Sequence, residues 1–492
     1  MEPLREWLTH HGVEVDPRLA LVQSDNSVHV IARAPIPPRE TVARIPRSIV
    51  LSRKTSALAR ALTTLDPPVD VDRAPFESLA PPVVLAIHVL YELAQGSAST
   101  WAPYLESCPR DPVDIALVWH PTGTARRWIV GTQLERHLDH VRVDPNVLAR
   151  VFTCVVEPVF ALVSPPLAAS RVSHSTFVHA YSLVCSRAFA VDHTYHGLSL
   201  VPFADAFDHA PPGEHDVEMC VDEQWVCPIC GTVPQCPHDL VDDVEPPSSQ
   251  HDDDDDDDVI EMVTTARGIE AGQEVYNSYG PLANARLVAE YGFKLEANPF
   301  DRVEFARSDL ERLVGSVQTA RAATRARNLD GSEDHPLIAD PDGPTAAAAA
   351  GQREPVFSFD ADAKVSRDLW VALVASLGGH AAREEELFFR ASAEIVSLDE
   401  GGGPDPPSSL PRRIVEGLGR VATLVHALCD GRLAGQSEPE LTASQLLDLA
   451  EEETDARVRL AIEFVAEERL LLERVRENWN PFVRSNPNSR VS

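Results

Sequence analysis

The chain has 492 residues, 44% of them hydrophobic, and a formal net charge of −33. This length and apolar content predict a globular protein of two or three domains and exclude a disordered chain. The acidity disfavours direct nucleic-acid binding, which needs Lys and Arg to neutralise phosphates; it favours either a basic partner or simple solubility.

The sequence does not predict a secretory signal peptide or a membrane span. The first residues, MEPLREWLTHHGVEVD, carry acidic side chains and no apolar signal core, and no run approaches the roughly 18 apolar residues that a membrane span needs. Eight cysteines in such a chain suit a reducing compartment. We therefore expect an intracellular protein without membrane contact. It is placed in the cytosol, with the nucleus as an alternative, because no Lys/Arg-rich import cluster decides between them.

The first third of the chain changes from strand-like to helical periodicity. The short runs VHVIA (28–32), ETVARI (40–45) and SIVLS (48–52) are separated by prolines and predict antiparallel strands. From Pro81, the apolar spacing of VVLAIHVLYELAQG (83–96) predicts an amphipathic helix that ends at Gly96. The whole interval 75–180 is expected to be helical, including 148–162 and 175–189.

Strand-like segments return in the middle of the chain, at 198–205, 261–266 and 274–280, followed by a helix at 283–293. Beyond about residue 300 the pattern is almost wholly helical, as in 308–326, 366–378 and 455–478, which predicts an all-α C-terminal domain. Two Gly-, Pro- and Ala-biased interruptions, 328–360 and 398–412, are expected to be connections. Residues 239–261 contribute twelve carboxylates and no Lys or Arg, and the run 241–258 within them is expected to be a solvated acidic loop.

Three stretches of the sequence carry the functional argument. They are SLVCSRAF (182–189), LVPFADAFDHA (200–210) and GQEVYNSYGPLANARLVAEYGF (272–293). With SASTWAPYLESCP (97–109), they resemble the RuBisCO large-subunit methyltransferase-like branch of the SET-domain family, in its fungal ribosomal and cytosolic protein-lysine methyltransferase type. The matching positions are Pro202, Asp205, Asp208, His209, Gly272, Tyr279, Gly280, Asn284, Leu287, Tyr291, Gly292 and Phe293.

The resemblance implies an α+β protein: a SET β-fold split by a helical insertion, followed by an all-α C-terminal substrate-binding domain. The expected boundaries are 1–74 for an N-terminal helix and the first part of the SET domain, 75–180 for the helical insertion, 181–300 for the second part with an insertion at 220–260, 301–480 for the substrate-binding domain and 481–492 for a tail.

Site roles also follow from the resemblance. Tyr279 is implied to be catalytic and Tyr291 to bind substrate. Residues implied to bind S-adenosylmethionine are Arg187, Asp205, Asp208, His209 and Phe293. Several have ordinary alternatives. Arg187 can simply pair with an acidic neighbour, His209 can be a hydrogen-bonded core histidine, and Tyr291 and Phe293 can be core aromatic residues.

Two positions depart from the family pattern. Ser27-Val28-His29 replaces a G-x-G motif near the cofactor, and Asp208 replaces an asparagine. Glycine allows close backbone approach to a ligand, so His29 predicts a cofactor pocket of altered shape. Asp208 is easier to accommodate, because a carboxylate also accepts hydrogen bonds and gains charge assistance beside an ammonium group.

A separate motif, WVCPICGTVPQCPHDL (225–240), lies inside the second insertion. Cys227-Pro-Ile-Cys230-Gly resembles a zinc knuckle, and Cys236 with His238 can complete a tetrahedral Cys3His site of structural type. A loop with reduced thiols, or Cys220 as a substitute ligand, is the alternative.

The sequence therefore favours an S-adenosylmethionine-dependent protein-lysine N-methyltransferase, expected to be a monomer. Its substrate is expected to be a basic protein, with ribosomal proteins and translation factors among the candidates. One alternative is a non-catalytic SET-fold adaptor for protein binding, motivated by His29 and Asp208. The other is a protein-histidine methyltransferase, since histidine methylation also occurs in this branch.

Overall fold

The computed structural model of the chain describes residues 2–24, 27–70, 72–73, 75–163, 171–220, 226–227, 229–231, 258–314, 337–338, 356–377, 387–393 and 410–484. It divides into two compact units. The first unit comprises Met1–Trp119, Val143–Gly280 and Glu290–Gly292, and the second comprises His120–Arg142, Pro281–Ala289 and Phe293–Ser492. The interval 75–180, expected as one insertion, therefore contributes to both units.

Short strands form the sheets of the first unit. They are β1 (Glu14–Val15), β2 (Leu19–Ser24), β3 (Ser27–Ala32), β4 (Thr41–Pro46), β5 (Leu51–Ser52), β6 (Ala188–Asp192), β7 (Gly197–Leu200), β8 (Asp208–His209), β9 (Val217–Cys220), β10 (Val259–Thr264) and β11 (Tyr276–Asn277). A six-stranded sheet has the order β1-β4-β10-β9-β11-β8, beside a β2-β3 hairpin and a three-stranded β5-β7-β6 sheet. The β8 and β11 strands pair in parallel, with Tyr276 opposite Asp208 and Asn277 opposite His209.

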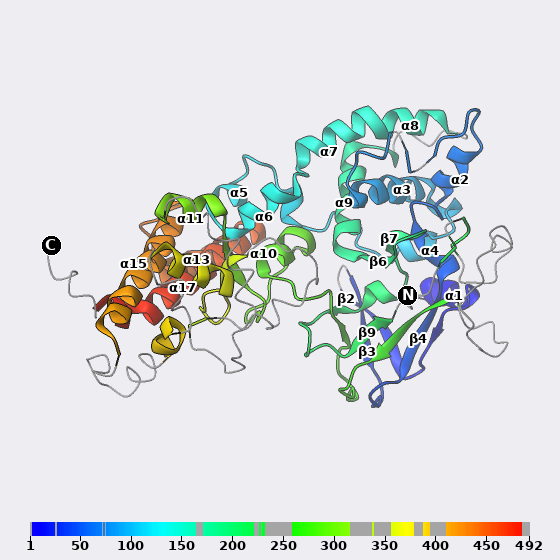
Figure 1. Ribbon diagram of the computed structural model, residues 1–492. Helices are drawn as coiled ribbons and strands as arrows, with labels where there is room; N and C mark the ends of the chain where they lie inside the picture. The colour runs from blue at the N-terminus through cyan, green and yellow to red at the C-terminus, as the bar shows by residue number, and fades with distance from the viewer. Residues whose placement is uncertain are drawn as a thin grey trace, which may run out of the picture. The chain divides into compact units, whose positions relative to one another are not determined.

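The first unit also contains helical segments. They are α1 (Glu2–His10), η1 (Arg47–Ile49), α2 (Ala57–Thr63), α3 (Pro81–Gln95), η2 (Gly96–Ala98), α4 (Ala102–Leu105), η3 (Ala116–Val118), α7 (Pro145–Val151), η4 (Phe152–Val156), α8 (Glu157–Leu162), α9 (His174–Arg187) and η6 (Ala204–Ala206). Of these, α3, α7, α8 and α9 lie above β3, β4 and β9 in Figure 1. The α3 helix is the central one, because nearly every side chain from Val83 to Ala94 is buried, and it packs against α9. A capping box, in which Ser173 and Thr176 bond each other's backbone N–H, fixes the start of α9.

The structure confirms several of the predicted elements, whereas others have different bounds or a different conformation. The helix predicted at 83–96 is α3, and those at 148–162 and 175–189 correspond to α7–α8 and α9. The strand predicted at 48–52 is wrong over most of its length, since η1 occupies 47–49 and only Leu51 and Ser52 pair in β5. The strand predicted at 198–205 stops at Leu200, because the chain turns into η6, and the helix predicted to 189 stops at Arg187.

Among the described residues, one stretch, Gln133–Leu162, is long and apolar enough to cross a membrane, by length and composition alone. The sequence analysis did not predict such a stretch. Within it, α6 ends at Val141, Arg142 has a left-handed φ of 57°, and α7 starts only at Pro145. The stretch is therefore interrupted rather than one continuous helix.

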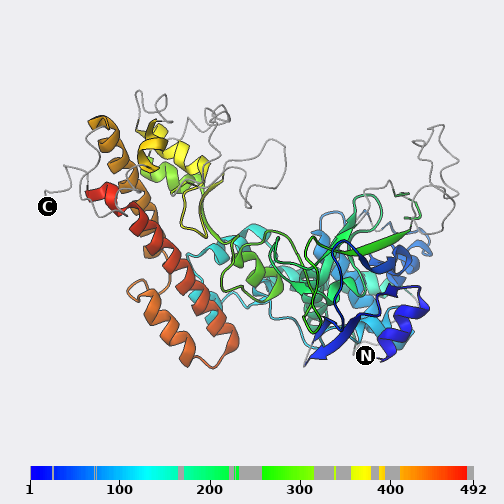
Figure 2. The same cartoon turned by 90° about the horizontal axis from the view of Figure 1, so that it is seen from below.

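The second unit is mostly helical. Its described elements are α5 (Thr124–Trp128), α6 (Gln133–Val141), α10 (Asn284–Arg286), β12 (Arg302–Phe305), α11 (Arg307–Val314), β13 (Phe357–Asp360), α13 (Arg367–Ser376), α15 (Arg412–Ala434), α16 (Ala443–Glu452) and α17 (Ala456–Arg484), with the π-helical turn η7 (Leu287–Tyr291) at its boundary. Figure 2 shows the long helix α17, in red, beside α15 and α16, in orange. Trp370 of α13 and Trp479 of α17 are both fully buried in the core of this unit.

The prediction of an all-α C-terminal domain is wrong in one respect. The β12 and β13 strands form an antiparallel pair, in which Arg302 lies opposite Asp360 and Phe305 opposite Phe357. The interval 328–360 was expected to be only a connection, yet it ends in β13, and its described residues Leu337 and Ile338 are buried. Ile338 also forms a bridge with Val365.

Candidate active site

Asp205 and Arg187 form a largely buried ion pair in the first unit. Nη1 of Arg187 donates to Oδ2 of Asp205 at 3.1 Å and to its backbone oxygen at 2.9 Å. Arg187 is the last residue of α9 and Asp205 lies in η6, so two separate elements present the pair. Phe203, just before η6, has a φ of 76°, which is strained for a non-glycine residue and indicates a backbone fixed by its surroundings.

A second buried partner of Asp205 was not predicted as a site residue. The hydroxyl of Tyr104, on α4, donates to the same Oδ2 atom at 2.9 Å. Burial raises the pKa of Asp205, while Arg187 and Tyr104 act in the opposite direction. Tyr104 lies inside the SASTWAPYLESCP segment that matched the family, and that match was the signal that could have identified it.

His209 and Tyr279 are joined across the parallel β8–β11 pair. Nδ1 of His209 accepts the backbone N–H of Tyr279 at 3.0 Å, and the two rings stack with centroids 4.9 Å apart. Tyr291 stacks on the Tyr279 ring at 5.0 Å. Tyr279 thus lies between two rings, and its hydroxyl donates to the backbone oxygen of Phe207 at 3.1 Å.

The Tyr279 phenol is held in its neutral form. The residue is partly exposed, but protein atoms enclose its hydroxyl end, and this burial raises the pKa of Tyr279 well above its ordinary value. The negative charge of Asp208 acts in the same direction, and the positive charge of Arg187 opposes it. At neutral pH the group is therefore a hydrogen-bond donor or an orienting dipole rather than a phenolate base.

Asp208 carries the exposed carboxyl group of this site. Partial enclosure of the carboxyl, followed by the hydrogen bond and like charge of Glu274, raises the pKa of Asp208 to about 6, whereas Arg187 and His29 lower it. The electrostatic effect of His29 on Asp208 means that the two departures from the family pattern are neighbours in space. The imidazole of His29 and the carboxyl of Asp208, which replace a glycine and an asparagine of the family pattern, therefore lie in the same part of the site.

Five predicted residues, together with Tyr291, are thus gathered in the first unit: Arg187, Asp205, Asp208, His209 and Tyr279. Their arrangement presents an anionic carboxyl, a guanidinium with only Nη1 bonded to described residues, a neutral imidazole and an aromatic wall. Phe293, expected to line the cofactor pocket, belongs to the second unit. Its cofactor role stays a prediction.

This geometry accompanies a likeness to known SET proteins. The chain is 26% identical over 321 residues to N-lysine methyltransferase setd6 of Xenopus laevis, covering 64% of this chain and 61% of that protein. It is 24% identical over 338 residues to ribosomal lysine N-methyltransferase 3 of Saccharomyces cerevisiae, covering 56% and 58%. The crystal structure of the SET domain of LSMT bound to lysine and AdoHcy superimposes with a TM-score of 0.57 at 18% identity, over 97% of this chain and 90% of that one.

The chain thus has the fold of the SET domain of LSMT and a sequence likeness to N-lysine methyltransferases. The structure of RuBisCO LSMT bound to AdoMet matches similarly, with a TM-score of 0.56 at 16% identity over 99% of this chain and 93% of that one. No protein-family model matches. The chain spans less than two thirds of the length of the curated relatives named above.

The predicted zinc knuckle is described in part. The backbone N–H of Ile229 donates to Sγ of Cys227 at 3.4 Å, and the N–H of Gly231 to the Cys227 oxygen at 2.9 Å. Cys227 is buried and Cys230 is partly exposed. The other two predicted ligands, Cys236 and His238, lie outside the described residues.

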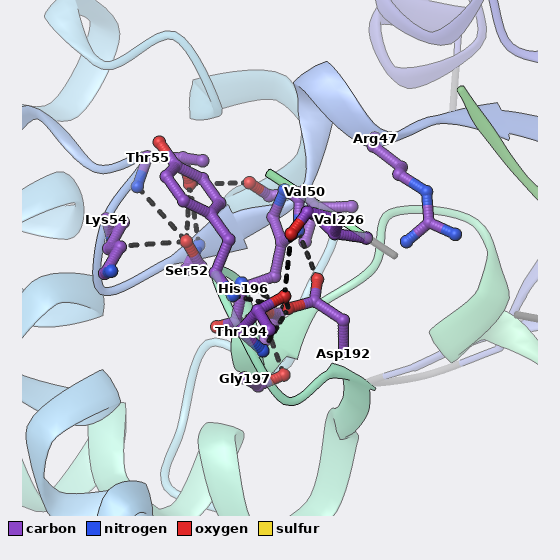
Figure 3. A network of polar contacts seen from close by, with 12 residues as sticks. Arg47, Val50, Ser52, Lys54, Thr55, Asp192, Thr194, His196, Gly197 and Val226 are labelled. Atoms are coloured by element: carbon purple, nitrogen blue, oxygen red, sulfur yellow. Dashed lines mark hydrogen bonds and ion pairs between the residues drawn. The ribbon is translucent and has the colours of Figure 1, made fainter. Parts of the chain in front are cut away.

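The knuckle packs on the turn between β6 and β7. Figure 3 shows the hydroxyl of Thr194 bonded to the backbone oxygen of Val226, at 3.2 Å. In the same turn, Asp192 accepts backbone N–H groups of Tyr195 and His196 at 2.6 and 3.0 Å. Gly231 has a φ of +81° and lies so close to the Tyr195 ring that a Cβ atom would overlap it. The first half of the predicted metal motif is therefore anchored to the SET core beside β7.

Proposed function

We propose that this chain is an S-adenosylmethionine-dependent protein-lysine N-methyltransferase. The observation that carries the proposal is the enclosed, neutral phenol of Tyr279, stacked between His209 and Tyr291 next to the charged groups Asp208 and Arg187. Curated relatives of the chain are named N-lysine methyltransferases, which supports the same reaction class.

The reaction requires a neutral amine aligned with the methyl group of the donor. Presenting a lysine, with a pKa of about 10.4, as a neutral amine near pH 7.4 costs roughly 4 kcal/mol. Apolar walls beside the positively charged sulfur of the cofactor reduce this cost, because burial and a nearby like charge disfavour the ammonium form of the side chain. Tyr279 and Tyr291 would supply such walls, and the Tyr279 hydroxyl would orient the amine. With its raised pKa, Tyr279 is not suited to remove the lysine proton itself, so that proton would leave to solvent.

The charges of the site fit S-adenosylmethionine. Bound there, the cofactor would supply an electrophilic methyl group on a positively charged sulfur. Its amino-acid part has an ammonium and a carboxylate, for which Asp208 and Arg187 are complementary partners. His209, Asp205 and Phe293 are proposed to complete the binding site. Asp208 would bind the ammonium more tightly as a carboxylate than the family's asparagine would as an amide, which offsets the bulk of His29.

The substrate is proposed to be a basic protein, because the chain carries a net charge of −33 that would steer basic partners towards it. Ribosomal proteins and translation factors are candidates of that kind. The helical second unit is proposed to select the substrate, and the protein to act as a monomer in the cytosol or nucleus without direct nucleic-acid binding. A protein-histidine methyltransferase and a non-catalytic adaptor remain the alternatives.

We also propose that the insertion holds a structural zinc ion through Cys227, Cys230, Cys236 and His238. Support comes from the N–H to sulfur bond at Cys227, which stabilises a thiolate ready for metal, and from the four-ligand chemistry of the sequence motif. With four protein ligands, the metal would have no open position for catalysis.

Two measurements on the full chain test the enzyme. Calorimetric titration with S-adenosylmethionine should give saturable binding, and mass spectrometry of proteins from cells with and without the gene should reveal lysine methylation that depends on it. Absence of cofactor binding would refute the enzyme and leave the adaptor. Gene-dependent methylation of histidine instead of lysine would select the other alternative.

A further inference from the structure

Tyr104 connects the helical insertion to the candidate active site. Its hydroxyl bonds Oδ2 of Asp205 at 2.9 Å, although the two residues are 101 positions apart in the sequence. Tyr104 is 2% exposed and Asp205 is 8% exposed, so neither oxygen has ready access to bulk water as a substitute partner.

The Tyr104 ring is itself held in place. Trp7 of α1 stacks on it with centroids 6.4 Å apart and planes inclined by 20°. The Trp7 indole N–H in turn donates to the backbone oxygen of Thr100 at 2.8 Å, two residues before α4 begins. The Cys108 thiol bonds the Tyr104 backbone oxygen. A side chain fixed on this many sides can direct its hydroxyl to one position.

Oδ2 of Asp205 accepts hydrogen bonds from both Tyr104 and Arg187. The titratable and charged groups that act around this carboxyl are Arg187 from α9, Tyr104 and Cys108 from the α4 segment, and Tyr279, on whose phenol Asp205 also acts. Burial raises the pKa of Asp205, and Arg187 and Tyr104 counteract that rise. Arg187 in turn exerts its positive charge on Asp208 and Tyr279.

We propose that Tyr104 is a positioning residue for methyl transfer: its hydroxyl fixes the Asp205 carboxylate, and that carboxylate fixes the Arg187 guanidinium at the edge of the site. This inference rests on the proposed methyltransferase function. Its proposed effect passes through Asp205, the residue that its hydroxyl bonds.

The test is Tyr104→Phe in the full chain, which removes only the hydroxyl. One lost hydrogen bond to a charged group predicts a roughly ten-fold fall in kcat/KM. With one donor fewer, Asp205 keeps its proton to higher pH, so the acid limb of the kcat/KM profile should move to higher pH. The matched control is Tyr91→Phe, since Tyr91 is also buried and its ring packs on Phe160 of α8. The control should leave the acid limb in place.

The outcomes separate this proposal from the enzyme itself. If the wild type neither binds S-adenosylmethionine nor methylates, the proposed function fails. If the wild type is active and folded Tyr104→Phe has an unchanged pH profile, or both tyrosine variants shift equally, only the positioning role fails. If Tyr104→Phe does not fold, Asp205→Asn decides: asparagine does not titrate, so the acid limb should move from its wild-type position, and an unchanged acid limb in that variant overturns the proposal.

Discussion

Nδ1 of His209 accepts the backbone N–H of Tyr279 at 3.0 Å. Since a backbone N–H can only donate, this nitrogen must be unprotonated, and the neutral ring carries its proton on Nε2. The bond joins the turn that carries Asp208 to the strand end that carries Tyr279, 70 residues later. Protonation of His209 would turn the acceptor into a donor and break this connection.

The first prediction concerns pH and stability. Burial, followed by the charge of His215, lowers the pKa of His209 to about 4, whereas an unfolded histidine has a pKa of about 6.5. Between these values the unfolded chain binds a proton that the native protein does not. The contribution of His209 to stability is therefore complete above about pH 6.5 and is lost as the pH falls towards 4.

Urea unfolding of the wild type and His209→Asn at pH 7.5 and 5.0 measures this contribution. Asparagine can still accept the Tyr279 N–H but does not titrate, so the wild type should lose more stability on acidification than the variant. Equal losses in both proteins would show that His209 has an ordinary pKa in the native state.

The second prediction concerns Tyr279→Phe. Phenylalanine keeps the ring between His209 and Tyr291 but removes the enclosed hydroxyl, so alignment in the transition state should suffer more than binding. We expect kcat to fall roughly a hundred-fold, as for the loss of one preorganised donor, and the dissociation constant for S-adenosylmethionine to change by no more than about three-fold. Single-turnover methylation and calorimetry measure the two effects. Undiminished turnover would remove Tyr279 from the catalytic role.

The sequence was most informative where function dictates residue order. The motifs of 200–210 and 272–293 predicted that Asp208, His209 and Tyr279 belong to one site, and they meet across the β8–β11 pair. Periodicity predicted α3 correctly because a 15-residue helix offers several turns of pattern. The fold class likewise followed from the combined motifs and element order.

Other features have no local signature. The β12 and β13 strands are four residues each, too short for periodicity, and more than 50 residues separate Phe305 from its partner Phe357. The bond between Tyr104 and Asp205 depends on two distant elements meeting, which no spacing in the sequence predicts. The closeness of His29 and Asp208 likewise depends on two distant elements meeting, although each residue departs from the family pattern by itself.

The third prediction uses Gly292, which directly follows Tyr291. Its φ is +81°, and a Cβ atom there would lie 2.8 Å from the backbone oxygen of Asp114. Gly292→Ala should therefore combine backbone strain with a steric overlap and destabilise the protein by about 3 kcal/mol. The control is Gly272→Ala, at a φ of +86° with no atom within 4 Å of the added carbon, which should cost about 1 kcal/mol. Urea unfolding measures the loss of stability in both variants. Equal losses would show that the backbone at Asp114 moves to accommodate the added carbon.

The fourth prediction concerns zinc. Purified protein, prepared without chelators, should contain about one zinc per chain, because two thiolates of the knuckle with Cys236 and His238 satisfy tetrahedral coordination. Cys227→Ser with Cys230→Ser should lose it, since serine keeps the size but provides no thiolate. The matched control, Cys154→Ser, alters an exposed cysteine in η4 and should keep the metal.

Loss of the metal should act on the SET core through the anchored turn. Thr194 bonds Val226, and Tyr195 packs against Gly231, at the connection that leads into β7 and on to Asp205. The double variant should therefore show faster hydrogen exchange in 194–200 before any global unfolding, while Cys154→Ser exchanges like the wild type. Elemental analysis that finds no zinc in the wild type, or full zinc in the double variant, would refute the assigned ligands. Unchanged exchange in a zinc-free variant would instead confine the metal's effect to the insertion.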